Sequence, residues 1–158
     1  MKSIEIGCRP NRRKVLIAAL SIGVASMLPG FALAASDGDP AALAFDGDTI
    51  LLARGGLFVS NNGGRTWTAT ETPGNVLSLA THRDRPGRVV AGLAEGGVSI
   101  SEDGGASWRV SDARLPDGEI TAVAIASRNP DMIYASVRGD GLWKSEDAGA
   151  TWSLAMDR

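Results

Sequence analysis

The chain contains a single cysteine in 158 residues, and the position of that cysteine removes several kinds of chemistry. Cys8 precedes an apolar run that begins at Val15, and it lies too early to be a lipoprotein anchor. Once a leader is removed, the remaining chain can form no disulfide and can supply no thiol nucleophile or thiolate metal ligand. We therefore expect the fold to be stabilised by packing.

Basic residues are also scarce beyond the N-terminal segment. Residues 1–34 hold five of the 16 lysines and arginines but only one of the 18 acidic residues, Glu5. The rest of the chain therefore has 11 basic and 17 acidic residues, a net charge of −6. An acidic surface repels phosphates, which argues against nucleic acid as a partner.

Residues 1–34 are typical of an export signal. A basic stretch precedes an apolar run over residues 15–28, and Ala32-Leu-Ala34 matches an A-x-A cleavage site. The run is short for a membrane span, and no second run follows it. We expect cleavage after Ala34, a periplasmic or secreted protein without a membrane span, and a disordered mature N-terminus over residues 35–40.

The sequence indicates the export route less clearly than it indicates export itself. Asn11-Arg-Arg-Lys-Val-Leu16 resembles the twin-arginine signal, but Asn11 and Val15 depart from its usual Ser or Thr and Phe. The pattern favours the twin-arginine route and leaves the general route open.

Three octets that end in tryptophan organise the rest of the chain. Their first residues, Ser60, Ser101 and Ser145, are spaced 41 and 44 residues apart, as expected when each repeat is one four-stranded propeller blade. The octets are Ser60-Asn-Asn-Gly-Gly-Arg-Thr-Trp67, Ser101-Glu-Asp-Gly-Gly-Ala-Ser-Trp108 and Ser145-Glu-Asp-Ala-Gly-Ala-Thr-Trp152.

These octets resemble the Asp box, or BNR repeat, with the pattern Ser-x-Asp-x-Gly-x-Thr-Trp. The resemblance implies relatives among sialidases, sortilin-type receptors and photosystem II assembly factors. It also implies an all-β array of three four-stranded antiparallel blades over residues 41–158, with each box between the third and fourth strands.

Each box position has a physical reason. A short side chain at Asn62, Asp103 or Asp147 can accept hydrogen bonds from the following turn, and Asn62 lacks the charge, so its turn should be the weakest. The invariant glycine should require a positive φ, and the tryptophan should open the next strand and fill the gap between sheets. The glycines are Gly64, Gly105 and Gly149. We expect a structural role, because the ligand spacing of a calcium loop is missing.

Alternating aliphatic residues and glycine-rich punctuation predict the strands of each blade. The first blade is predicted over residues 41–45, 49–54, 57–60 and 66–70, with a hairpin turn at Asp46-Gly-Asp48. The second is predicted over 76–81, 88–94, 98–101 and 107–111, and the third over 120–126, 132–137, 142–145 and 151–156.

Sialidase chemistry needs three arginines on the substrate carboxylate and a tyrosine nucleophile with a carboxylate base. The only tyrosine, Tyr134, falls within a predicted second strand and is expected to line the core. The amino-terminal Arg-Ile-Pro motif of sialidases is absent as well. The only histidine, His82, stands beside Asp84, but no motif places a nucleophile near it, which favours a solvated loop. We predict no catalytic residues, metal or cofactor.

Six charged residues are candidates for holding a ligand. A basic cluster on the face that carries the boxes could dock a carboxylate or an acidic protein surface, although charged turns are usually only solvated. A second set ends strands at the opposite face and could hold an anionic sugar or a peptide carboxylate. The first set is Arg83, Arg85 and Arg88, and the second is Arg54, Glu95 and Arg138.

Three blades are fewer than the four to eight of closed propellers. Two copies could close a six-bladed ring, with blade three of each meeting blade one of the other, and a charge placed outward at Val123 should weaken that dimer if the side chain faces the junction. A partner, an open array or a truncated gene are alternatives. The sequence favours an exported, non-catalytic module that binds protein or glycan, with a sialidase-like glycoside hydrolase fragment as the alternative.

Overall fold

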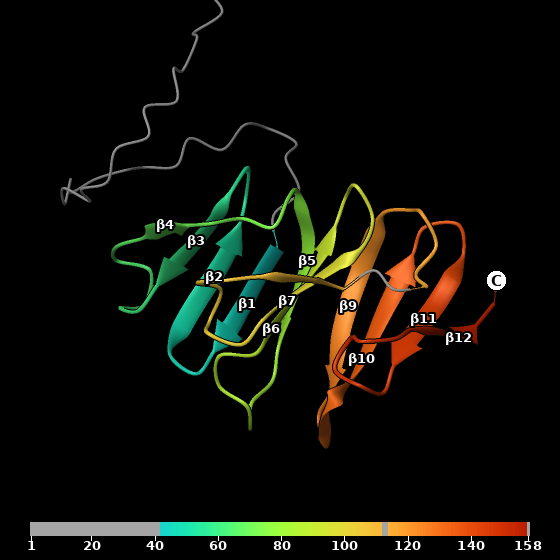
Figure 1. The fold of residues 1–158 in the computed structure, drawn as a ribbon. Helices are drawn as coiled ribbons and strands as arrows, with labels where there is room; N and C mark the ends of the chain where they lie inside the picture. The colour runs from blue at the N-terminus through green and yellow to red at the C-terminus, as the bar shows by residue number, and fades with distance from the viewer. Residues whose placement is uncertain (1–41, 112–113, 158) are drawn as a thin grey trace, which may run out of the picture. The chain divides into compact units, whose positions relative to one another are not determined.

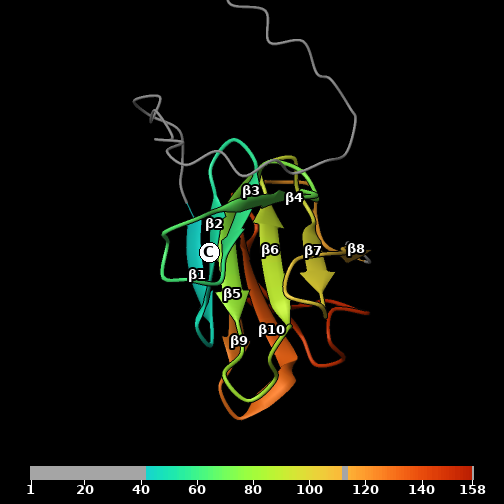
Figure 2. The ribbon, with the colours of Figure 1, turned by 90° about the vertical axis from the view of Figure 1, so that its left-hand side faces the viewer.

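The computed structural model describes residues 42–111 and 114–157, which form twelve strands in three four-stranded sheets. Each sheet is built from four consecutive antiparallel strands, so each is one propeller-type blade (Figure 1). Figure 2 shows the middle blade in the order β5, β6, β7 and β8. Among the described residues there is no helix long and apolar enough to cross a membrane.

The strand bounds follow the prediction closely. Blade one is β1 (Ala42–Asp46), β2 (Thr49–Ala53), β3 (Leu57–Ser60) and β4 (Thr68–Thr70). Blade two is β5 (Val76–Thr81), β6 (Val89–Leu93), β7 (Val98–Ser101) and β8 (Arg109–Ser111). Blade three is β9 (Ile120–Ala126), β10 (Asn129–Val137), β11 (Gly141–Ser145) and β12 (Ser153–Met156).

The fourth strands begin later than predicted. Each starts just after the box tryptophan, so Trp67, Trp108 and Trp152 precede these strands and do not open them. The residue before the tryptophan is held in the turn, because its N–H donates to the box Asn or Asp side chain instead of to a neighbouring strand. The predicted hairpin at Asp46-Gly-Asp48 is confirmed, with Gly47 at a φ of 60°.

Side chains alternate between the two faces of each sheet, and the blades pack face to face. We call the face toward the following blade the forward face and the other the rear face. Blades one and two meet in a cluster that includes Ala42, Leu57 and Ala91, and blades two and three meet in one that includes Ile100 and Ile133.

Two predicted orientations in blade three are wrong. Val123 packs into the cluster with blade two, because a register shift between Ser136 and Val137 puts both Ile120 and Val123 on the rear face. Tyr134 alternates with the buried Ile133 and Ala135, so it lies half-buried on the forward face and does not line the core.

Candidate functional site on the box face

The three box turns share one hydrogen-bonding plan. In the second box, the Gly105 N–H donates to Ser101 Oγ at 2.8 Å, and the Ser107 N–H donates to Asp103 Oδ1 at 2.8 Å. The third box repeats both bonds at the same distances through Ser145 and Asp147. The predicted positive φ is confirmed, at 81° for Gly64, 91° for Gly105 and 83° for Gly149.

The box carboxylates are held in their charged form. Hydrogen bonds from the Ser107 hydroxyl and N–H lower the pKa of Asp103 to about 2, and those from Thr151 lower the pKa of Asp147 to about 2. In the first box Asn62 cannot be charged, and its Nδ2 donates to Thr66 Oγ1 at 2.7 Å. The Thr66 hydroxyl therefore accepts a hydrogen bond from Asn62 in the first box. In the other two boxes the hydroxyls of Ser107 and Thr151 instead donate to the box carboxylates.

The second and third boxes also dock onto the blade before them. Thr70 Oγ1 donates to the Gly105 carbonyl at 2.6 Å, and Ser111 Oγ donates to the Gly149 carbonyl in the same way. Both hydroxyls stand three residues after a box tryptophan, a regularity that the sequence shows and that our sequence interpretation missed. The buried Trp152 donates its indole N–H to Ser111 Oγ at 3.1 Å, which adds a second bond to the same junction.

The loop that carries His82 connects β5 and β6 in blade two and contacts blade three. His82 is 4% exposed, so its side chain is not solvated as expected, although residues 83–86 of the same loop are exposed. The Asp84 N–H donates to Nδ1 at 3.2 Å, which places the ring proton on Nε2, and Nε2 lies 3.2 Å from the Ala126 carbonyl oxygen of blade three. Both ring nitrogens are thus engaged in structural contacts.

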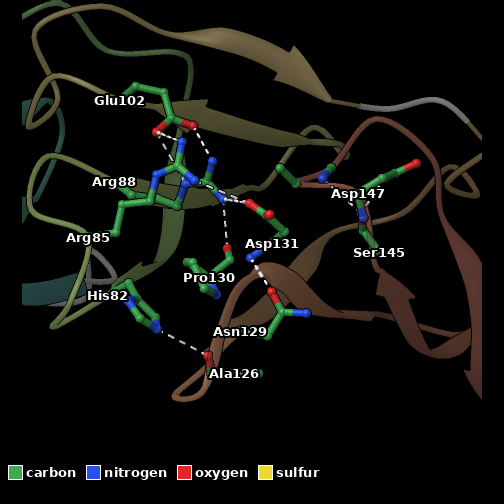
Figure 3. A network of polar contacts seen from close by, with 12 residues as sticks. His82, Arg85, Arg88, Glu102, Ala126, Asn129, Pro130, Asp131, Ser145 and Asp147 are labelled. Atoms are coloured by element: carbon green, nitrogen blue, oxygen red, sulfur yellow. Dashed lines mark hydrogen bonds and ion pairs between the residues drawn. The ribbon is translucent and has the colours of Figure 1, made fainter.

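Arg85 and Arg88 pair with two carboxylates from different blades (Figure 3). Arg88 is 2% exposed and contacts Glu102 Oε1 at 2.6 Å, Asp131 Oδ1 at 3.0 Å and the Pro130 carbonyl at 2.7 Å. Arg85 pairs with the same two carboxylates at 3.4 and 3.3 Å from a more exposed position. The alternating charges connect the second box to blade three. A ligand-binding role for these arginines stays a prediction.

The remaining candidates are separated from this network. Arg83 is exposed on the same loop. Arg138 pairs with Glu119, with 2.5 Å between Nε and Oε2, and Glu95 accepts the Asn75 N–H at 3.3 Å. The Arg54 N–H donates to the Gly56 carbonyl at 2.8 Å. A shared anion site at this opposite end stays a prediction.

A crevice of about 360 Å³ lies on the box face between blade one and the second box. Its lining mixes polar and apolar groups and comes from both blades. The lining residues are Asp46, Thr49, Val59, Asn61, Thr68, Thr70, Asp103, Gly104, Gly105 and Ala106. Among the described residues no group of three or more His, Cys, Asp or Glu side chains could hold a metal ion.

The arrangement of blades is similar to that of several solved structures. An NkGH74 enzyme from Niastella koreensis matches with a TM-score of 0.60 and 18% identity over 75% of this chain and 22% of that protein. YCF48 from Cyanidioschyzon merolae matches with a TM-score of 0.58 and 20% identity, over 73% of this chain and 37% of that protein. The structure of YCF48 bound to D1 peptide matches with a TM-score of 0.56 and 18% identity, over 73% of this chain and 40% of that protein.

These comparisons show the fold alone. The chain has a propeller-type fold. It spans between 22% and 40% of the length of these proteins. The similar structures include both YCF48 and a GH74 enzyme. No protein-family model and no curated protein matches the chain.

Proposed function

We propose that this chain is an exported, non-catalytic propeller-type module whose blade one binds another protein. The observation that carries the proposal is the rear face of blade one. Leu43 and Phe45 are 56% and 59% exposed on this face, and cross-strand pairing places Ile50, Leu52 and Phe58 beside them. Soluble proteins seldom leave such a contiguous apolar patch without a partner.

The chemistry of this face indicates what it binds. The rear faces of blades two and three are buried against the forward face of a preceding blade. Their boxes accept a hydroxyl from that blade, as Gly105 does from Thr70. Blade one carries the same box groups at Gly64 and Trp67 beside its apolar rear face. The occupant is therefore the apolar face of a propeller-type blade that belongs to another protein and carries a hydroxyl on its outer strand.

A second copy of this chain is a poorer occupant. Its free forward face, on blade three, has Lys144 where blades one and two have Val59 and Ile100. Ala155 stands three residues after Trp152, where the other blades have a hydroxyl. A register shift also places the exposed Met156 opposite Leu142. The closed six-bladed homodimer therefore lacks the features that join blades within the chain.

The hydrolase alternative has less physical support. The carboxyls of Asp103 and Asp147 do not suit a general acid, which needs a raised pKa, because turn hydrogen bonds lower their pKa values to about 2. The Tyr134 hydroxyl lies 3.3 Å from the Met132 sulfur on the forward face of blade three. The similarity to GH74 enzymes concerns the fold, which does not by itself imply activity.

Export remains part of the proposal. Residues 1–41 lie outside the described part of the chain, so the signal peptide and the segment over residues 35–40 rest on the sequence. The proposed periplasmic or secreted location rests on the same N-terminal pattern.

Photo-crosslinking in the cells that produce the protein tests the proposal. A benzoylphenylalanine residue replaces Phe45 in one version and the exposed Val110 in a matched control. We expect position 45 to give one adduct, with a propeller-type protein, and position 110 to give none. That protein should bind the purified chain and should bind the Phe45→Glu variant more weakly.

Three results contradict the proposal. An adduct with a second copy of the chain supports the homodimer, and an adduct with a protein of another fold removes the blade-type partner. Hydrolysis of sialosides or of a panel of other glycosides by the purified protein, above the rate of an unfolded control, supports the enzyme.

A further inference from the structure

The two junctions between blades differ at the first position of the outer strand, which is Thr68 in β4 and Arg109 in β8. At the junction of blades two and three, the Arg109 guanidinium donates to the Ala148 carbonyl in the third box. Arg109 follows Trp108 directly, and the residue that follows Trp67 is Thr68. Gly104 in the second box corresponds to Ala148 in the third. Blade one therefore has no guanidinium at the position that Arg109 occupies in blade two.

The space over the second box is the crevice described above. Thr68 and Gly104 both line it, so it occupies the place that the Arg109 side chain takes at the other junction. The two junctions share the bond from the outer-strand hydroxyl, because Thr70 and Ser111 donate equivalent hydrogen bonds to Gly105 and Gly149. They differ at the tryptophan, since Trp152 donates to Ser111 while Trp108 donates to Gly105 in its own box. The protein thus holds a filled and an empty copy of one arrangement.

The lining of the crevice suits a positive charge. Asp46 and Asp103 contribute two carboxylates, and the threonine and asparagine side chains add oxygen acceptors. Asp103 is held ionised by its hydrogen bonds within the turn, and Asp46 Oδ2 accepts the Gly87 N–H at 2.7 Å while its other oxygen takes no hydrogen bond from the described residues. A planar guanidinium can donate to a carbonyl and to nearby carboxylates at once.

We propose that this crevice binds an arginine side chain of a partner protein, in the manner in which Arg109 binds the third box. The site lies on the box face, and its chemistry differs from that of the apolar rear face of blade one. It neither requires the rear face to bind a blade nor depends on the identity of that partner.

Titration followed by protein NMR tests the site with a defined probe. The probe is N-acetyl-arginine-amide, and N-acetyl-citrulline-amide is its uncharged control of nearly the same shape. We expect saturable shifts of the Gly104, Gly105 and Ala106 amides with arginine, at a Kd on the order of millimolar because one side chain supplies few contacts, and no saturation with citrulline.

Three variants test the comparison between the two junctions. Thr68→Arg supplies the missing guanidinium from within and should abolish the shifts. Arg109→Thr empties the second junction and should add a second set of shifts around Ala148. Asp46→Asn keeps an acceptor for Gly87 but removes a charge, and should weaken binding about threefold to tenfold at low salt.

The proposal is overturned if arginine and citrulline give the same shifts, or if Thr68→Arg folds and still binds the probe at the second box. If Thr68→Arg does not give a dispersed spectrum, Arg109→Thr decides, since failure to gain a second site contradicts the equivalence. Equal shifts with a lysine analogue show that the crevice selects charge and not the guanidinium, and they overturn the arginine assignment.

Discussion

The three box tryptophans should contribute unequally to stability, because among the described residues only Trp108 and Trp152 pack against a preceding blade. Trp152 is 3% exposed and lies in the cluster between blades two and three, while Trp108 packs partly buried against the cluster between blades one and two. Trp67 belongs to blade one, whose rear face is exposed. Truncation to alanine should therefore cost least at Trp67 and most at Trp152.

The magnitudes follow from burial. Trp152→Ala should lower the unfolding free energy by about 3 to 5 kcal/mol, the range for large aromatic side chains in cores. Trp108→Ala should cost about 2 to 3 kcal/mol, and Trp67→Ala about 1 kcal/mol or less, because less apolar area leaves water. Trp152→Phe keeps most of the ring but loses the N–H bond to Ser111, and should cost about 1 to 2 kcal/mol.

Urea denaturation followed by far-UV circular dichroism measures the series, since that signal does not depend on tryptophan fluorescence. Midpoints and slopes are compared, because a changed slope indicates a changed unfolding unit. An equal loss at Trp67 and Trp152 would refute the reasoning, because it would mean that the first box is as deeply packed as the third.

Four further results are expected. Arg88→Met should lower stability by about 1 to 3 kcal/mol in urea, since it leaves the Pro130 carbonyl without its partner and leaves half-exposed Glu102 with only the longer contact to Arg85. The pKa of Asp147 falls from 3.8 unfolded to about 2 folded, so its contribution is present above pH 4 and is lost as the pH falls toward 2; Asp147→Asn should flatten acid unfolding in that window. Ala148→Gly should stabilise by about 0.5 to 1 kcal/mol, because Ala148 has a φ of 59° where the other boxes have glycine. Sequencing of exported protein should begin at Ala35.

Each of these results has a contrary outcome. A fully stable Arg88→Met protein would show that the ion pairs between blades contribute nothing. An Asp147→Asn variant with unchanged acid unfolding would place the pH dependence elsewhere. Ala148→Gly that destabilises would show that the turn is not strained. Retention of Met1 on exported protein would remove the cleavage site.

The blades were predictable because their signals are local. The box fixes a turn through side-chain bonds within eight residues, and alternation between glycine-rich turns fixes the strands. The error at the start of the fourth strands has the same local origin, since the N–H of Ser107 satisfies Asp103 and does not join a strand pair.

The candidate site was less predictable, because its contacts cross between blades. His82 and Arg88 stand in a charged stretch that looks solvated, but their partners are Ala126 and Asp131, more than 40 residues away. Likewise, the position of Val123 depends on a register shift that no alternation pattern contains. The crevice became visible only when two junctions could be compared in space.

The most direct test of the central claim, that blade one presents an accessible apolar face, is the fluorescence of 1-anilinonaphthalene-8-sulfonate with the native protein. Leu43→Glu and Phe45→Glu should reduce dye binding strongly without lowering the urea midpoint. Val110→Glu adds the same charge at another exposed position and should change dye binding little. Dye binding that falls equally in all three variants, or unfolding of Phe45→Glu, would contradict the claim, because the face would then be either inaccessible or part of the core.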